Sequence, residues 1–141
     1  MNAEEETLRE ESRKAPDYQN IIGKIVFVEI DRPLGSRHPK HPDIIYPINY
    51  GYVKDIIGED GEEQDVYLLG VDEPVKEFRG QVIAVFHRYN DVEDKWIVAP
   101  IGSDFSDEYI LEKIHFQEQF FQGELYNTQF SSKNIPYTKG L

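Results

Sequence analysis

The sequence predicts one mainly β domain, a small barrel or sandwich of short strands with a helix late in the chain. Its 141 residues are the usual size of one domain rather than two. Short segments rich in β-branched and aromatic residues recur between turn signals, which is typical of small barrels and sandwiches. The first clear helical spacing of apolar residues comes only after residue 105.

Five segments are predicted to be strands, because each is short, apolar and bounded by turn-forming residues. They cover residues 22–31, 46–57, 65–70, 80–88 and 95–100. Residues 31–45 form a loop with three prolines and a basic character that is unusual in so acidic a chain. Residues 58–64 form a tight acidic turn around Gly61.

The helix is predicted to begin after Ser106, whose side chain can cap its first turn. Ile110, Ile114 and Phe121 give it an apolar stripe that can pack on the sheet. Gly123 is expected to end the helix. The whole chain is expected to divide into three regions. Residues 1–20 are an acidic N-terminal extension that is helical or disordered, residues 21–126 are the barrel domain with its helix, and residues 127–141 are a polar, loose C-terminal tail.

Composition excludes several classes of function. The chain has 27 acidic and 15 basic residues and a net charge of −12, the wrong sign for a nucleic-acid binder. It has no cysteine, which excludes disulfides, thiolate zinc sites, iron–sulfur clusters and a cysteine nucleophile. No apolar run approaches the length of a membrane span, and the N-terminus lacks the features of a signal peptide. We therefore expect a cytoplasmic protein without nucleic-acid or membrane partners.

Two acidic turns are the first candidate sites. In residues 60–65, the bend at Gly61 directs Asp60, Glu62 and Asp65 toward one space. Converging carboxylates repel one another unless a cation neutralises them, and oxygen ligands select hard divalent ions. Taken alone, this segment is more often a solvated hairpin turn.

The second acidic turn contains Asp91, Glu93 and Asp94 and is followed at once by Lys95. It too is an ordinary hairpin turn when taken alone. Two such turns in one small barrel can meet at the same end, however. A pair of metal ions that clamps a phosphate needs that arrangement.

The loop after the first strand is basic, with Arg32, Arg37, His38, Lys40 and His41 within ten residues. Cations beside metal-binding carboxylates suit a polyanionic ligand such as a phosphoanhydride. The alternative is a surface loop that its prolines make rigid.

The next strand is aromatic, and alternation places Tyr46, Ile48, Tyr50 and Tyr52 on one face. Such a face is usually a wall of the core. A tyrosine hydroxyl at its rim can still reach a phosphate.

Residues 46–52 (YPINYGY) and 60–65 (DGEEQD) together resemble the soluble family I inorganic pyrophosphatases. In that family a Tyr-Pro-x-Asn-Tyr-Gly strand precedes an Asp-Gly-Asp-x-x-Asp turn. The resemblance covers about residues 24–121. It implies a closed five-stranded, OB-like β-barrel with a helix packed on it. It also implies hydrolysis of inorganic pyrophosphate, or a related phosphoanhydride, with two or more Mg²⁺ ions, Mn²⁺ as an alternative metal, and assembly as a homo-oligomer.

The resemblance also assigns roles to individual residues, with Glu62 in place of the aspartate that acts as general base. The catalytic residues it implies are Tyr50, Glu62, Asp65 and Lys95. The substrate-binding residues are Glu29, Arg37, Lys40, Tyr50 and Lys95, with Arg37 and Lys40 as alternatives. The metal ligands are Asp60, Asp65, Asp91, Glu93 and Asp94, with the choice among the last three left open.

Besides Glu62, the chain departs from the family pattern in three ways. The hairpin before Tyr46 and the second acidic turn are shortened, and Phe120 and Phe121 stand where the family has a Tyr-Lys pair. An alternative function is therefore a barrel that binds a phosphorylated ligand or a protein partner without catalysis.

Overall fold

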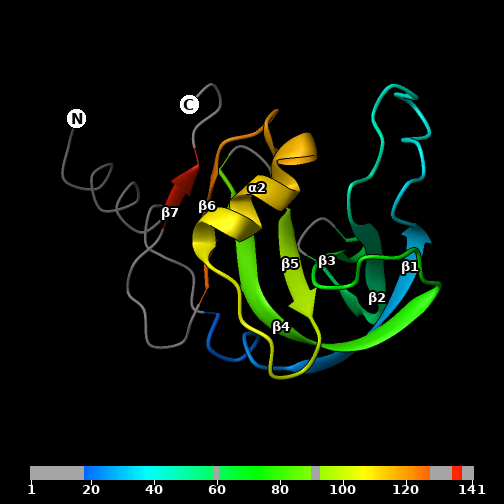
Figure 1. Cartoon of the computed structure of the whole chain (residues 1–141). Helices are drawn as coiled ribbons and strands as arrows, with labels where there is room; N and C mark the ends of the chain where they lie inside the picture. The colour runs from blue at the N-terminus through cyan, green and yellow to red at the C-terminus, as the bar shows by residue number, and fades with distance from the viewer. Residues whose placement is uncertain (1–17, 59–60, 90–92, 128–134, 138–141) are drawn as a thin grey trace, which may run out of the picture.

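The structure, a computed structural model, describes residues 18–58, 61–89, 93–127 and 135–137. The barrel strands in this part of the chain are β1 (Ile25–Arg32), β2 (Asn49–Ile57), β3 (Glu63–Leu68), β4 (Glu77–Arg88) and β5 (Asp94–Ala99). They close in the order β1-β2-β3-β5-β4, and β4 pairs back with β1 (Figure 1). Neighbours are antiparallel except β3 and β5, which are parallel. The predicted class, a closed five-stranded barrel, is confirmed.

Each predicted strand is present, with ends that differ by a few residues. β2 begins at Asn49 rather than at Tyr46, and Pro47 between them has no N–H to give to a strand ladder. β4 begins at Glu77 rather than at Gly80, because residues 77–81 pair with β1 before the strand continues along β5. A strand that changes its pairing partner keeps the same alternation of apolar and polar residues, so the sequence pattern does not reveal the change.

Two strands that the sequence analysis did not predict extend the sheet beyond the barrel. β6 (Gly123–Tyr126) pairs with the end of β4, and β7 (Ile135–Tyr137) pairs with β6. The expectation that Gly123 ends the helix is wrong, because Gly123 begins β6. A β-carbon there would lie 2.2 Å from the carbonyl oxygen of His87, so the glycine permits the close approach of β6 to β4. Part of the tail expected to be loose is therefore a strand.

The helix α2 (Asp107–Glu118) lies across β4 and β5 in Figure 1. Ser106 caps it as predicted, since its hydroxyl accepts a hydrogen bond from a backbone N–H of the first turn at 3.2 Å. Ile110 and Ile114 are buried as predicted. The third buried position of this face is Glu118, where the helix ends. A buried carboxylate needs partners, and these lie at the candidate site described below.

Two apolar clusters form the core. Every barrel strand contributes to the first, which therefore fills the barrel interior around Val28, Leu68 and Val98. The second lies between the barrel wall and α2. Alternation along β3 and β5 sends successive side chains to the two clusters in turn. Tyr18, placed by sequence in the N-terminal extension, belongs to the first cluster.

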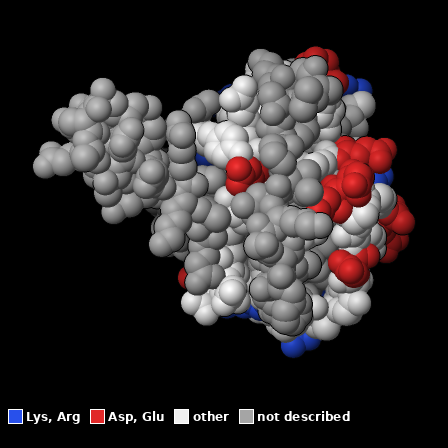
Figure 2. Space-filling view, turned by 90° about the vertical axis from the view of Figure 1, so that its left-hand side faces the viewer, with Lys and Arg blue, Asp and Glu red and all other residues white. Residues whose placement is uncertain are grey.

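The surface is acidic. On the face shown in Figure 2, Asp and Glu side chains are more prominent than Lys and Arg, in keeping with the net charge of −12. Within the described residues, no helix has the length and apolar character needed to cross a membrane. Residues 1–17, expected to be helical or disordered, lie outside the described residues.

The close approach of β1 and β2 predicts that Gly51→Ala destabilises the barrel. A β-carbon at this position would lie 1.8 Å from the carbonyl oxygen of Glu29, so the two strands must separate. Overpacking costs about 1–3 kcal/mol or more, and we expect a loss of that size in the free energy of unfolding from denaturant titration. Lys54→Ala, at an exposed position of β2, is the control and should change it by less than about 0.5 kcal/mol. Equal effects of the two substitutions would contradict this account.

Candidate functional site

An open pocket of about 680 Å³ lies between the loop after β1 and the C-terminal end of α2. Its walls come from loop residues 38–44, from residues 117–121 at the end of the helix, and from the barrel. The Asp, Lys and Arg side chains that line it are Arg32, Asp43, Asp65, Arg88 and Lys95.

Strand pairing places Asp65 beside Lys95. The parallel register joins Val66 to Trp96, so the residues that precede these two are adjacent. Lys95 faces the pocket, whereas Trp96 packs in the barrel interior. Asp94 therefore lies on the face of β5 opposite to Lys95.

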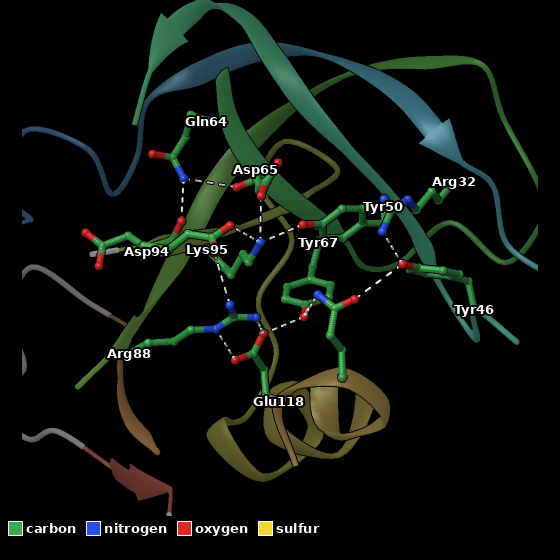
Figure 3. A network of polar contacts seen from close by, with 12 residues as sticks. Arg32, Tyr46, Tyr50, Gln64, Asp65, Tyr67, Arg88, Asp94, Lys95 and Glu118 are labelled. Atoms are coloured by element: carbon green, nitrogen blue, oxygen red, sulfur yellow. Dashed lines mark hydrogen bonds and ion pairs between the residues drawn. The ribbon is translucent and has the colours of Figure 1, made fainter. Parts of the chain in front are cut away.

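Lys95 is buried, with 3% of its surface exposed, and oxygen atoms surround its ammonium group. The ammonium donates hydrogen bonds to the Tyr50 hydroxyl (2.6 Å), to Asp65 Oδ2 (2.6 Å) and to Glu93 Oε1 (Figure 3). An ammonium has three N–H donors, and these three acceptors satisfy all of them. In this arrangement the single positive charge of Lys95 is shared between two carboxylates.

The pKa values of the two carboxyl groups beside Lys95 are shifted in opposite directions from their ordinary values: that of Asp65 is lowered and that of Glu93 is raised. Burial raises the pKa of Asp65, but hydrogen bonds with Glu93 and Lys95 outweigh burial and hold it below its ordinary value. Burial and the hydrogen bond with Asp65 raise the pKa of Glu93, despite the charges of Lys95 and Arg88. Burial, followed by the charge of Asp65, raises the pKa of Tyr50 well above its ordinary value. The Tyr50 hydroxyl therefore stays protonated near neutral pH.

Arg88 is the second buried cation, and Glu118 of α2 holds it. Its guanidinium donates to the two Glu118 carboxylate oxygens at 2.8 and 2.6 Å and to Glu93 Oε2 at 3.1 Å. The Tyr67 hydroxyl donates to the same Glu118 carboxylate at 2.6 Å. The guanidinium also lies over the Phe121 ring, 3.6 Å from its centre. These contacts compensate a carboxylate that is fully buried.

Among the described residues, Arg32 is the Lys or Arg of the pocket lining that forms no ion pair with a carboxylate. Its guanidinium donates to the Tyr46 hydroxyl at 2.7 Å and lies 5.7 Å from the centre of the Tyr50 ring. No Asp or Glu oxygen of the described residues is within ion-pair distance of it. Hydrogen bonds continue from Tyr46 through Gln117 to Tyr67, so the loop side of the pocket is connected to α2 (Figure 3).

Two predicted site residues have partners elsewhere. Asp94 accepts a hydrogen bond from the Tyr18 hydroxyl at 2.8 Å, and its second oxygen lies 2.8 Å from His87 Nδ1. Glu29 accepts a hydrogen bond from the Tyr52 hydroxyl at 2.9 Å. Neither carboxylate lines the pocket.

The remaining predicted residues are exposed or outside the described part of the chain. Glu62, Arg37 and Lys40 are exposed, and none of the three lines the pocket. Asp60 and Asp91 lie outside the described residues. From the predicted set, the structure brings together Tyr50, Asp65, Glu93 and Lys95.

Sequence reasoning did not select Arg88 or Glu118, and it named Arg32 only as one of the five basic residues of a candidate loop. Glu118 does have a signal, since an acidic residue in line with Ile110 and Ile114 on a buried helix face indicates a buried cation as partner. Arg88 closes an apolar strand and carries no comparable signal. Arg32 stands in the basic loop, where nothing in the sequence separates it from the other cations.

Two neighbouring carboxylates at the site suit a hard divalent cation. Asp65 belongs to the pocket lining, and Glu93 lies beside Asp65 outside that lining. Among the residues that the structure describes, there is no group of three or more His, Asp or Glu side chains that could hold a metal ion. The described carboxylates therefore fit Mg²⁺ in kind, and they number two.

Neither a protein-family model nor a curated protein matches the chain. Solved structures of inorganic pyrophosphatases do resemble it. The enzyme from Neisseria gonorrhoeae is 25% identical with a TM-score of 0.50, over 71% of this chain and 79% of that chain. The one from Ehrlichia chaffeensis is 18% identical with a TM-score of 0.57, over 75% and 87%. The one from Helicobacter pylori is 18% identical with a TM-score of 0.55, over 83% and 91%. The chain thus has a pyrophosphatase-like fold.

Because Glu118 compensates Arg88 in the interior, Glu118→Ala should strongly destabilise the protein. Removal of one partner of a buried ion pair costs about 3–5 kcal/mol, and we expect a loss in this range from urea denaturation. Glu112→Ala, at an exposed position of the same helix, should cost less than about 0.5 kcal/mol. The double variant Arg88→Met/Glu118→Leu should be more stable than Glu118→Ala, because it leaves no unpaired buried charge. A Glu118→Ala protein as stable as the control would show that the pair is not needed.

Proposed function

We propose that this protein hydrolyses the phosphoanhydride bond of inorganic pyrophosphate, or of a related phosphoanhydride, with Mg²⁺ as its cofactor. The observation that carries the proposal is the convergence of Tyr50, Asp65 and Lys95 in the lining of one open pocket of a pyrophosphatase-like barrel, with Glu93 bonded to Lys95 beside it. Carboxylates beside cations suit both a metal ion and a phosphate. Phosphate release from pyrophosphate, measured with Mg²⁺ and with EDTA, tests it.

Asp65 and Glu93 are the described residues that would hold Mg²⁺. When bound, Mg²⁺ neutralises phosphate oxygens and promotes the ionisation of water. Lys95 keeps Asp65 and Tyr50 in place through its hydrogen bonds, and Arg88 does the same for Glu93. Groups held in this way need little rearrangement when the substrate binds.

Arg32 takes the phosphate-holding role in this proposal. It lines the pocket, and within the described residues no carboxylate pairs with it. Its planar guanidinium can bind two phosphate oxygens at once. Arg37 and Lys40, named from the sequence for this role, do not line the pocket. Glu62, implied as general base, does not line it either, and we assign it no step.

A second candidate function is binding of a phosphorylated ligand without hydrolysis. The observation that favours it is that the protein's own cations already bond to Asp65, Glu93 and Glu118. The phosphate-release assay separates the two functions when it is combined with calorimetry of pyrophosphate binding. Mg²⁺-dependent release supports hydrolysis, whereas saturable binding without release supports the second candidate.

Asp65→Asn should lower Mg²⁺-dependent hydrolysis by about 100-fold or more and leave the fold intact. The amide preserves the size of the side chain but removes the charge that would attract the metal ion. The measurement is phosphate release from pyrophosphate, with circular dichroism as the check on folding. Asp72→Asn, at an exposed position away from the pocket, is the control and should keep activity within about twofold. Activity of Asp65→Asn within about threefold of wild type would exclude a metal-binding role for Asp65.

Arg32→Ala should lower kcat/KM for pyrophosphate by about 10- to 150-fold, which corresponds to a charge-assisted hydrogen bond of about 1.5–3 kcal/mol. Arg37→Ala and Lys40→Ala are matched controls, since each removes a cation of the loop that follows Arg32, from outside the pocket. They should stay within about twofold of wild type. Should either control lose activity while Arg32→Ala keeps it, the sequence-based assignment would be right and the one made here wrong.

A further inference from the structure

The pocket is larger and more apolar than inorganic pyrophosphate requires. Its volume of about 680 Å³ lies in the range of roughly 300–1,000 Å³ that accommodates drug-sized ligands. Besides charged groups, its lining includes Ile44, Phe120 and Phe121, which a bare phosphate anion does not use. The lining therefore indicates a ligand that carries an organic group next to its phosphates.

Phe120 is the exposed aromatic ring of this pocket. It lines the pocket, and 55% of its surface is exposed. Among the described residues, its ring stacks on no other ring and no cation lies over it, whereas Arg88 lies over the neighbouring Phe121. An aromatic face left exposed in a concave site can stack on the flat group of a ligand.

The loop side of the pocket presents aromatic rings in fixed positions. His38 Nδ1 accepts hydrogen bonds from the backbone N–H groups of Lys40 (3.1 Å) and His41 (3.2 Å), which orient the ring. The His38 ring is nearly parallel to the Tyr46 ring, with an interplanar angle of 10° and centres 6.2 Å apart. The His41 ring lies 5.0 Å from that of His38. The His38 ring is thus oriented before any ligand binds, which lowers the entropy cost of stacking on it.

We propose that the pocket binds a nucleoside diphosphate, with the base against Phe120 and the rings of His38 and His41, and the phosphates at the charged end near Arg32. The inference rests on the proposed function for its phosphate end and adds the class of substrate. A nucleobase is flat and has a π-face on each side, so it can stack on aromatic walls. An aliphatic chain has no such face, so a nucleobase fits this pocket better.

Hydrolysis of such a substrate balances in the same way as hydrolysis of pyrophosphate. The oxygen of one water bonds to the terminal phosphorus, and the bond from that phosphorus to the bridging oxygen breaks. The products are a nucleoside monophosphate and inorganic phosphate, and one proton is released to solvent.

Calorimetric binding of two uncleavable ligands, both with Mg²⁺ present, tests the inference. The ligands α,β-methylene-ADP and methylenediphosphonate share the P–C–P group and differ in the nucleoside. We expect the nucleotide to bind about 5- to 150-fold more tightly, the range that base stacking on an aromatic side chain supplies.

Matched variants assign this preference to one ring. Phe120→Ala should remove most of the affinity ratio, and Phe120→Trp should preserve it because the indole also stacks. Phe27→Ala is the control, since it removes a similarly exposed phenyl ring (51%) from β1, outside the pocket lining, and should leave the ratio unchanged.

Equal affinities for the two ligands would overturn the inference, as would an unchanged ratio in Phe120→Ala. Tighter binding of geranyl diphosphate than of α,β-methylene-ADP would also overturn it, since the wall would then be an aliphatic site. Because this experiment measures binding and the proposed function is tested by phosphate release, the two proposals can be contradicted independently of each other. A nucleotide preference without any phosphate release from pyrophosphate would leave this inference standing. Pyrophosphate hydrolysis with equal affinities would overturn only this inference.

Discussion

Charge compensation between two buried cations and three carboxylates is the interaction on which the structure depends. Lys95 and Arg88 are 3% and 4% exposed, and burial of either charge without a partner would cost several kcal/mol. Asp65, Glu93 and Glu118 supply the partners. These five residues come from β3, β4, the chain just before β5, β5 itself, and α2. The charges are therefore compensated only when the helix is packed on the closed barrel, which links the site to the stability of the whole fold.

The barrel topology explains why these groups meet. The parallel pairing of β3 with β5 places Asp65 beside Lys95, and the antiparallel pairing of β2 with β3 places Tyr50 opposite Tyr67. From Tyr67, hydrogen bonds extend through the side chains of α2 and of the chain before β2 to Arg32. The loop after β1 and the helix are thus joined across the pocket. Side chains held by such a network are oriented before a ligand arrives.

The pocket contains both carboxylates, which attract a cation, and basic side chains, which attract an anion. Lys95 offsets the Asp65 and Glu93 charges, while Arg32 adds a positive charge that no carboxylate of the described residues pairs with. Partial burial strengthens both kinds of attraction, because the local dielectric constant is lower than that of water. In a chain with a net charge of −12, such a pocket is a local exception to an acidic surface. Its charge pattern suits an anion accompanied by a metal ion better than either alone.

The sequence by itself determined the fold class, the approximate positions of the five barrel strands and the Ser106 cap. Those features follow from local pattern and spacing, which act within a short window of the chain. Tyr50, Asp65 and Lys95 were selected together because their motifs resemble those of a known family, and the structure brings the three side chains into contact. Only the tertiary structure decided that Glu93 rather than Asp94 accompanies Lys95, because this depends on which face of β5 packs inside the barrel. The tertiary structure also revealed the strands β6 and β7, the ion pair of Arg88 with Glu118, and the position of Arg32 in the pocket lining. Arg88 finds Glu118 across 30 positions of sequence, and a pairing between distant elements depends on how sheet and helix meet, which no local window contains.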